Sequence, residues 1–286
     1  MSKKKKITVG IIIAVLCAIL LWFLFGTFSP FEGIRKLYYQ KGELVSLKDT
    51  VPAIADEIHL TAHRGVNLLA PENTVPAYEK ATELGYYSAE CDIKQTKDGT
   101  WVLYHDPILY SRFQKIGAVG DKDLKTIKSY EYKTGAAFWE YKDLRIPTLN
   151  EFLDVFKNTK TRPQIEIKTS NYDSLLSVLD AVKAHGMQKR AIIISFDLDQ
   201  LKEIRKADKE IELWYLVYTI KQKDIDAAKS LGNCWLSADY GMNNAKSISL
   251  CLEQDVGLSL WTVDKPEDVQ TLYDLGVRYI ETDKLY

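Results

Sequence analysis

This sequence of 286 residues contains few cysteines and few histidines, and it has no surplus of positive charge. Only four cysteines occur, and Cys17 lies in a long apolar run, so an odd number remains and no disulfide framework is indicated. The formal net charge is −1, and Lys3 to Lys6 contribute +4, so everything after them sums to −1 − 4 = −5. A mildly acidic body argues against a nucleic-acid-binding protein, which needs a basic face.

Charged residues are missing altogether from positions 7 to 30. A helix needs about 20 apolar residues to cross a bilayer, whereas the apolar part of a cleavable signal peptide has roughly 7 to 15. We therefore expect an uncleaved transmembrane signal anchor at residues 7–28. The lysines before it predict a cytoplasmic tail at residues 1–6, which puts the rest of the chain outside the cell, on a single-pass protein of the cell membrane. We assign residues 29–56 to a juxtamembrane linker.

From residue 57 onward, short apolar runs alternate with segments of helical period. Eight runs are predicted to be strands: residues 58–62, 88–93, 164–168, 191–196, 211–218, 234–238, 257–263 and 278–282. Helical periodicity falls between most of them, at residues 74–84, 149–156, 172–184, 198–206, 224–231, 245–254 and 267–275. Such alternation predicts an α/β fold with a parallel sheet, and eight strands are the number of a (β/α)₈ TIM barrel. We expect this barrel over residues 57–286.

Two departures from the ideal repeat are visible. Residues 97–147 interrupt the second unit, and they begin with Lys97-Asp98-Gly99-Thr100, a hairpin turn before a strand at 101–105. The chain ends just past the eighth strand, so the last helix of the barrel is missing. We expect residues 31–56 to cover that gap.

Charged side chains occur within strands that a barrel should bury. Glu90, Asp92 and Lys94 share one face of their strand because side chains alternate, and Glu166 and Lys168 do the same on the next barrel strand. Three carboxylates that converge inside a barrel make an oxygen-rich site for Mg²⁺ or Ca²⁺. The alternative is that these carboxylates form ion pairs with the basic side chains near them, Arg64, Lys94 and Lys168.

Two of the four histidines, His63 and His105, lie at strand ends beside these carboxylates. Imidazole titrates near neutral pH, so these two are the candidates for proton transfer. His59 and His185 are assigned to structural roles.

Several short motifs occur together in one order. They are His63-Arg64-Gly65, Pro71-Glu72-Asn73-Thr74, Glu90-x-Asp92, Thr96-x-Asp98-Gly99, His105-Asp106, Ile146-Pro147-Thr148-Leu149, Glu166-Ile167-Lys168, Trp261-Thr262-Val263 and Thr282-Asp283. In order and approximate spacing, they resemble the glycerophosphodiester phosphodiesterase family over residues 58–284.

The resemblance implies roles for individual residues. Glu90, Asp92 and Glu166 match the family's metal ligands, and His63 and His105 match its acid/base pair. Three further side chains match its substrate-binding positions: Arg64 and Lys168 for the phosphate, and Trp261 as a wall for the alcohol. The activity so implied is metal-dependent hydrolysis of a glycerophosphodiester to an alcohol and glycerol 3-phosphate.

Other residues near these motifs have open or structural interpretations. We expect Glu72 and Asn73 to cap the helix that starts near residue 74. Asp283 could reach the site or form a structural pair. Trp139 and Tyr141, in the inserted segment, could shape the substrate site, although local packing is the commoner role of such residues.

Alternative functions concern the substrate and, in one case, catalysis itself. An anchored enzyme outside the cell could act on lysophospholipids or on the polyglycerol-phosphate polymers of a bacterial wall. The partner is then a small or lipid-derived phosphodiester, with no nucleic acid involved. A catalytically inactive surface binding module is a different class, but it should lack a histidine or a carboxylate of the set, and all five are present.

Overall fold

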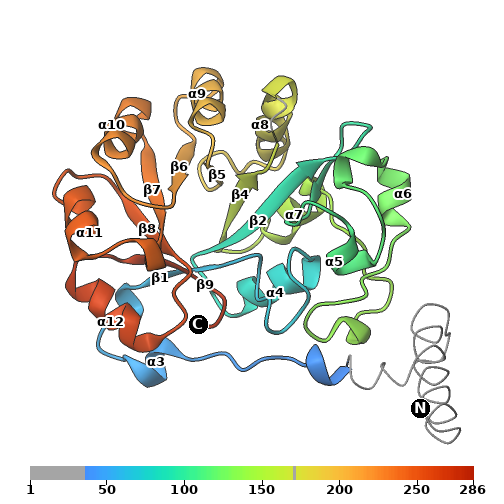
Figure 1. Cartoon of the computed structure of the whole chain (residues 1–286), viewed down its shortest axis with the longest axis horizontal. Helices are drawn as coiled ribbons and strands as arrows, with labels where there is room; N and C mark the ends of the chain where they lie inside the picture. Colours follow the sequence, from blue (N-terminus) through green and yellow to red (C-terminus); the bar gives the residue numbers. More distant parts are fainter. Residues whose placement is uncertain (1–35, 170–171) are drawn as a thin grey trace, which may run out of the picture. The chain divides into compact units, whose positions relative to one another are not determined.

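Eight parallel strands close into a barrel in this computed structural model, which describes residues 36–169 and 172–286. Closure occurs because β1 pairs with both β9 and β2 (Figure 1). The barrel strands are β1 (His59–Ala62), β2 (Ser88–Gln95), β4 (Arg162–Ile167), β5 (Ile192–Ser195), β6 (Glu212–Val217), β7 (Cys234–Asp239), β8 (Leu258–Trp261) and β9 (Tyr279–Thr282). All eight lie within or overlap the predicted runs, so the predicted TIM barrel is confirmed.

The barrel interior is apolar and aromatic on one side. Ile192 and Ile194 of β5 point inward, whereas Ile193 between them packs outward into the main core. The rings of Trp214 and Trp235 stack inside the barrel, with centroids 5.4 Å apart and planes 7° apart. The buried carboxylates of the barrel strands, Glu90, Asp92, Glu166 and Glu281, lie instead on β2, β4 and β9.

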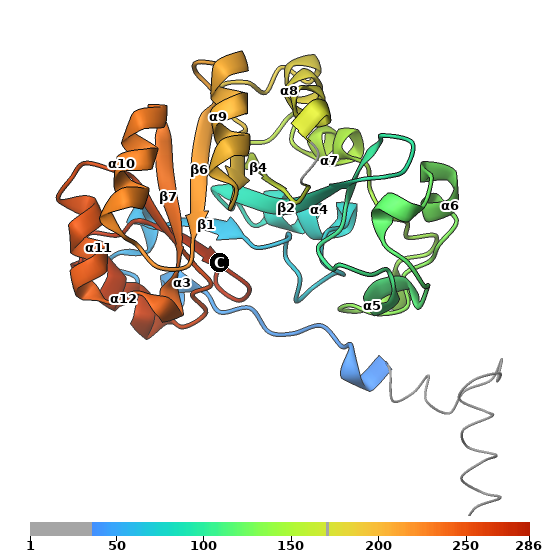
Figure 2. The ribbon, with the colours of Figure 1, turned by 45° about the horizontal axis from the view of Figure 1, so that its top comes forward.

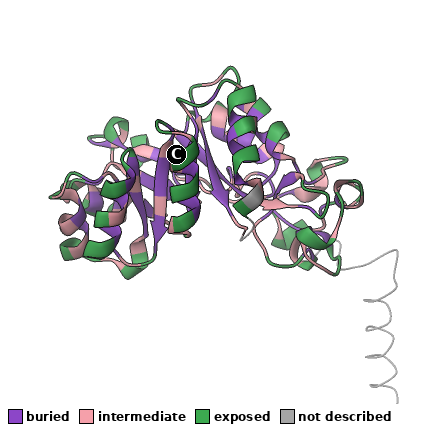
Figure 3. Cartoon of the chain, turned by 90° about the horizontal axis from the view of Figure 1, so that it is seen from above, coloured by how far each residue is buried: buried purple, intermediate pink, exposed green. Residues whose placement is uncertain are grey.

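Helices surround the strands and bury one face each against them. The α-helices of the barrel are α4 (Val75–Glu83), α7 (Leu149–Val155), α8 (Leu175–Ala184), α9 (Leu198–Ala207), α10 (Gln222–Leu231), α11 (Ala245–Leu252) and α12 (Pro266–Asp274). Two 3₁₀-helices, η4 (Tyr172–Ser174) and η5 (Tyr240–Met242), precede α8 and α11. Helix starts follow local capping chemistry: Thr148 and Glu151 form a capping box on α7. In Figure 3 the strands are buried and the outward faces of the helices are exposed.

The inserted segment has a small core of its own. Strand β3 (Trp101–Leu103) pairs antiparallel with β2, as the predicted hairpin requires. The rest contains α5 (Tyr110–Phe113), η2 (Val119–Asp121), α6 (Leu124–Lys128) and η3 (Phe138–Glu140). Val102, Tyr104, Phe113 and Ile127 are among the buried residues that pack together there. Figure 2 shows α5 and α6 beside each other, to one side of β2.

Residues 41–56 pack with the barrel, since the compact unit that contains it begins at Lys41. Val45 forms a bridge with Leu285, and Leu47, in α3 (Leu47–Thr50), is 2% exposed within the main core. A short 3₁₀-helix, η1 (Ala55–Glu57), leads into β1. This part of the predicted covering segment therefore packs next to the residues that follow β9.

Over the described residues, no helix is both long enough and apolar enough to span a membrane. The predicted anchor at residues 7–28 lies outside the described residues.

Candidate active site

Four buried carboxylates meet where the polar strands adjoin. Glu90 and Asp92 lie on β2, Glu166 on β4 and Glu281 on β9, and they are 1%, 1%, 9% and 4% exposed, respectively. Asp92 and Glu166 are partners in the register of β2 and β4. Burial of ionised groups costs several kcal/mol each unless opposite charge or hydrogen bonds compensate. The way each carboxylate is compensated therefore indicates what the site can bind.

Two basic side chains compensate Asp92 and Glu166. Lys168 Nζ lies 3.2 Å from Asp92 Oδ1 and 2.7 Å from Glu166 Oε1. Arg64 Nε lies 3.3 Å from Asp92 Oδ2. Burial alone would raise the pKa of Asp92, but the charges of Lys168 and Arg64 lower it to about 2. Ion pairs were the alternative to a metal site in the sequence analysis, and those of Arg64 and Lys168 with the carboxylates exist. Lys94 forms none with them and donates instead to the backbone oxygen of Asp106.

Compensation is incomplete for Glu166, despite its ion pair with Lys168, and for Glu281 and Glu90. Burial, followed by repulsion from Asp92, raises the pKa of Glu166 to about 7. Burial also raises the pKa of Glu281 to about 7, although His63 opposes the shift. Glu90 accepts a hydrogen bond from the backbone N–H of Arg64 on Oε2, and burial raises its pKa well above the usual value. Its other oxygen, Oε1, is buried without a partner in the described part of the chain. With all four carboxylates ionised, the cluster would therefore carry a surplus of negative charge.

This cluster could hold a divalent cation. One carboxylate oxygen from each of Glu90, Asp92 and Glu166 lies within 4.8 Å of the others. Oxygen-only ligands suit Mg²⁺ and Ca²⁺. The buried Oε1 of Glu90, which has no hydrogen-bond partner among the described residues, is a ligand atom that such a cation could take.

Each of the two candidate histidines has a carboxylate on the same ring nitrogen. His63 Nδ1 lies 2.9 Å from Asp283 Oδ1, and His105 Nδ1 lies 2.9 Å from Asp106 Oδ1. Asn67 donates a second hydrogen bond to Asp283 Oδ1. Because an ionised carboxylate can only accept, Nδ1 of each ring carries the proton and Nε2 is left for chemistry.

The surroundings shift the two histidines in opposite directions. Burial would lower the pKa of His63, but the hydrogen bond to Asp283 and the charge of Glu281 raise it overall. Burial lowers the pKa of His105, and the nearby charge of Asp92 offsets this only in part.

Glu72 and Asn73 do not cap a helix, so that prediction is wrong. The N-cap of α4 is Thr74, and no side-chain cap hydrogen bond forms there. Asn73 instead donates to Asp92 Oδ2 at 2.8 Å and accepts from the Asp92 backbone N–H at 3.0 Å. Asn73 therefore fixes the orientation of Asp92.

Glu72 connects Arg64 to the inserted segment. It lies 3.3 Å from Arg64 Nη1 and 2.8 Å from Nη2 of Arg112, which belongs to α5. The guanidinium of Arg64 is thus held between Glu72 and Asp92.

Three aromatic rings gather at the carboxyl ends of β5, β6 and β8. Trp261 lies 5.9 Å from Phe196 and 6.0 Å from Tyr218 between ring centroids, and Phe196 and Tyr218 are 5.0 Å apart. Phe196 is 38% exposed and Tyr218 57%. In the inserted segment, Trp139 packs on Phe138 and Tyr141 donates to the backbone oxygen of Leu69. Trp139 and Tyr141 thus make local contacts, a ring contact and a hydrogen bond.

Comparison with known proteins decides the family. Residues 63–285 match the model of the "Glycerophosphoryl diester phosphodiesterase family". The chain belongs to this family. A glycerophosphodiester phosphodiesterase of Caldanaerobacter subterraneus subsp. tengcongensis is 30% identical over 226 residues, which cover 78% of this chain and 92% of that protein. A glycerophosphodiester phosphodiesterase of Bacillus subtilis is 27% identical, with 80% of this chain and 84% of that protein covered.

Solved structures of the family share the fold. A phosphodiesterase of Oleispira antarctica, in complex with the product sn-glycerol-3-phosphate, superposes with a TM-score of 0.73 at 22% identity, covering 84% of this chain and 96% of that one. A glycerophosphodiester phosphodiesterase of Parabacteroides distasonis gives a TM-score of 0.65 at 24% identity, covering 85% and 94%. The predicted enzyme class is confirmed: the chain is a glycerophosphodiester phosphodiesterase, which hydrolyses glycerophosphodiesters.

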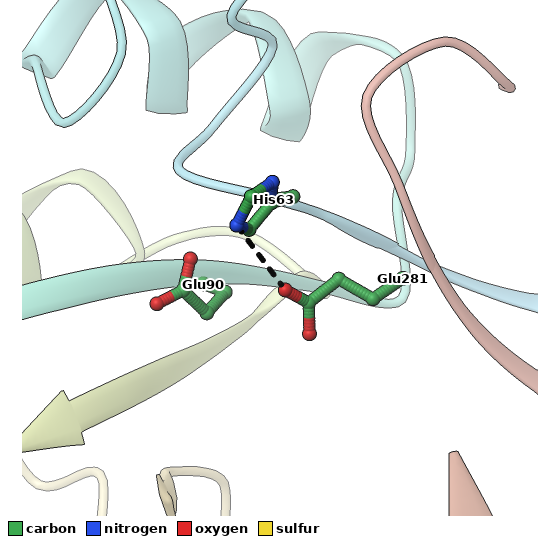
Figure 4. Close-up of side chains that lie close together, drawn as sticks. All are labelled: His63, Glu90 and Glu281. Atoms are coloured by element: carbon green, nitrogen blue, oxygen red, sulfur yellow. Dashed lines mark ion pairs between the residues drawn. The ribbon is translucent and has the colours of Figure 1, made fainter. Parts of the chain in front are cut away.

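Within this family site, sequence reasoning missed Glu281. The structure brings together seven of the eight residues singled out in advance around the acidic cluster, and Trp261 joins the aromatic group. Glu281 carried the same signal as Glu90 and Glu166, a carboxylate in an otherwise apolar strand, and could have been found from it. His63 and Glu281 face each other in Figure 4, with Glu90 beside them; the dashed line there marks the 3.9 Å between His63 Nε2 and Glu281 Oε1.

Proposed function

We propose that this enzyme cleaves its diester with His63 and His105 as a proton-transferring pair and with a divalent cation, Mg²⁺ or Ca²⁺, held by Glu90, Asp92 and Glu166. The observation that carries the proposal is the matched pair of histidines. Each histidine forms a hydrogen bond through Nδ1 with an aspartate, and both histidines adjoin the acidic cluster. When bound, the cation supplies Lewis-acid polarisation of the phosphate and charge neutralisation.

The protein side chains then have separable tasks. Arg64 and Lys168 bind the phosphate oxygens and stabilise the charge that builds up on them. One imidazole takes the proton from the attacking hydroxyl through Nε2, and the other gives a proton to the oxygen of the leaving alcohol. The attacking group is water, or the glycerol 2-hydroxyl by way of a cyclic phosphate. Trp261 forms a wall for the alcohol moiety.

A second substrate class has an observation in its favour. Phe196, Tyr218 and Met242 follow the carboxyl ends of β5, β6 and β7, on the side of the barrel where the site lies, and all three are exposed. Exposed apolar side chains beside a site suit a lipid-derived alcohol. Lysophospholipids are therefore the alternative to a soluble glycerophosphodiester that this observation favours. A wall polymer of polyglycerol phosphate is polar, and only the proposed location outside the cell favours it.

We also propose the domain layout and location that the sequence predicts. A cytoplasmic tail at residues 1–6 and an anchor at residues 7–28 precede the segment predicted as a linker, 29–56, of which residues 41–56 pack with the barrel at 57–286. The charge-free apolar run after four lysines supports this layout. External protease should then remove the barrel from intact cells and leave the tail protected. If external protease instead cleaved the tail and left the barrel intact, the orientation would be the opposite of the one proposed.

The reaction is tested with the full-length chain in detergent micelles, using glycerophosphocholine as substrate. We expect release of glycerol 3-phosphate to stop with EDTA and to return with Mg²⁺ or Ca²⁺. His63→Ala and His105→Ala should each lower kcat by about 10²- to 10⁴-fold. With a nitrophenyl ester, whose leaving group needs no proton, one of the two variants should recover and the other should not. Recovery of both variants, or of neither, would contradict the paired roles.

A further inference from the structure

Two of the four buried carboxylates, Glu90 and Glu281, take no part in the ion pairs with Arg64 and Lys168. Arg64 and Lys168 compensate Asp92 and Glu166. Among the described residues, neither Glu90 nor Glu281 has an arginine or lysine as an ion-pair partner, and Glu281 receives a hydrogen bond from Gln164 Nε2 at 3.3 Å. Two buried carboxylates without a cationic partner form an electrostatic deficit that a cation would relieve.

Glu90 and Glu281 form a group with His63 that is distinct from the metal triad. Nε2 of His63 and one oxygen from each glutamate lie within 4.8 Å of one another, as the oxygens of Glu90, Asp92 and Glu166 do. The two groups share only Glu90. One ligand atom from each of the five residues is not found within 4.8 Å as a single group, because the atoms fall into two groups. Ligands of one Mg²⁺ ion, at 2.0–2.1 Å from it, lie at most about 4.2 Å apart, so the two groups describe two neighbouring cation positions.

Two further observations point to a ligand at the second position. Glu90 is 1% exposed, and its Oε1 is buried with no partner in the described structure, so the shared side chain has a free ligand atom. Asp283 holds His63 through Nδ1 at 2.9 Å, which turns Nε2 toward the two glutamates (Figure 4). A carboxylate on the other ring nitrogen is the usual support of a metal-binding histidine.

The ligand types separate the two positions chemically. The triad offers oxygen alone, which suits Mg²⁺ or Ca²⁺. The second position offers one imidazole nitrogen and two carboxylates, a set of the kind found around Zn²⁺. In a tetrahedral Zn²⁺ site with ligands at about 2.0–2.2 Å, neighbouring ligand atoms are roughly 3.4 Å apart. The 3.9 Å between His63 Nε2 and Glu281 Oε1 is close to that separation.

We propose that His63, Glu90 and Glu281 form a second cation position, which takes an imidazole-preferring ion such as Zn²⁺ and thereby inhibits the enzyme. This inference rests on the proposed function, since inhibition follows from the role of His63 in proton transfer. A cation on Nε2 occupies the lone pair that would accept or pass on a proton, so the bound ion and the acid/base role exclude each other.

The test is a calorimetric titration of the full-length, Mg²⁺-saturated enzyme with Zn²⁺. Wild type should bind Zn²⁺ without releasing Mg²⁺. Glu281→Gln should weaken this binding by at least about 10-fold, because loss of a direct ligand should cost no less than loss of a supporting side chain. Glu72→Gln, a matched change beside Arg64 but outside both groups, should bind Zn²⁺ as wild type does. Co²⁺ in place of Zn²⁺ should give a visible spectrum that Glu281→Gln loses.

Inhibition gives the second readout. The Zn²⁺ concentration for half inhibition, taken relative to the zinc-free rate of each variant, should rise at least about 10-fold in Glu281→Gln and stay unchanged in Glu72→Gln. Zn²⁺ that displaces Mg²⁺, or that binds Glu281→Gln as tightly as wild type, would overturn the second position. Failure of the proposed function looks different, because Mg²⁺ would then not bind in calorimetry or would not restore turnover after EDTA.

Discussion

Asp283 and Asp106 orient the two histidines of the site in the same way, each by a hydrogen bond with Nδ1 of the ring. A carboxylate on Nδ1 fixes the tautomer of the ring and the direction of Nε2. The two pairs differ in what else surrounds them, because His63 faces Glu281 whereas His105 lies near Asp92 and Arg64. We therefore regard Asp283 as a positioning residue for His63, with an effect on the imidazole that its removal should reveal.

Asp283→Asn keeps an acceptor oxygen at this place but removes the negative charge. We expect kcat to fall by roughly 10- to 100-fold, part of what a general acid or base contributes, with little change in KM. Because the Asp283 hydrogen bond raises the pKa of His63, the limb of the pH–rate profile that belongs to His63 should move to lower pH. The chain offers a matched control in Asp154, which lies 3.3 Å from His185 Nε2 on the outside of the barrel. Asp154→Asn should leave kcat and the profile unchanged; an unchanged profile in Asp283→Asn as well would refute the positioning role.

At the scale of elements, the loop before α4 orients Asp92, one of the proposed metal ligands. Tyr78, within α4, donates its hydroxyl proton to Asn73 Oδ1 at 2.9 Å, and Asn73 in turn holds Asp92. The helix thus connects the packed outer core to a carboxylate inside the barrel. Partners of this outer kind orient metal ligands and tune their affinity.

Tyr78→Phe removes only the hydroxyl from this connection. Loss of one buried hydrogen bond should cost about 1 kcal/mol, which corresponds to about 2–4 °C in Tm for a chain of this size, and Mg²⁺ should bind more weakly. Tyr132→Phe is the matched control, because the Tyr132 hydroxyl is buried without a partner within the described residues. Its removal should leave stability unchanged or raise it, and should not affect Mg²⁺ binding. Equal losses in both variants would mean that packing, and not the hydrogen bond to Asn73, matters.

Periodicity predicted the elements well for a physical reason. An alternation of apolar runs such as Ile192-Ile193-Ile194 with amphipathic segments is imposed by burial itself, so it can be read along the chain. The role of Asn73 could not be read in this way. A loop asparagine before a helix has the usual pattern of a cap, and only the approach of β2 shows that its side chain bonds Asp92.

At the scale of the whole molecule, the two ends of the barrel unit are joined to each other. Val45 donates to the backbone oxygen of Lys284, Tyr286 donates to Val45, and Tyr86 donates its hydroxyl proton to the backbone oxygen of Leu285. The sequence predicted a covering segment but not these partners, because pairing between distant segments leaves no periodic signal. This attachment makes residues 41–56 part of the unit whose stability is measured.

The stability of that unit should depend on pH and on metal together. Glu166 and Glu281 have pKa values of about 7 in the folded chain, against the usual 4.5. Between these values the folded state keeps protons that the unfolded state has released, so the free energy of unfolding falls as pH rises from about 4.5 to 7. The raised pKa of His63 acts in the same direction, whereas the lowered pKa of His105 opposes it.

In EDTA, we therefore expect a lower Tm at pH 8 than at pH 5.5, by about 2–4 °C for each kcal/mol lost. The pKa of Asp92 is lowered to about 2, so its effect on the free energy of unfolding changes only below pH 5.5, outside the range compared. A divalent cation binds the ionised carboxylates, so Mg²⁺ should raise Tm at pH 8 far more than at pH 5.5 and flatten the dependence. Differential scanning fluorimetry at both pH values, with and without Mg²⁺, measures this directly. A Tm in EDTA that rises with pH would show that Glu166 and Glu281 are already compensated without metal.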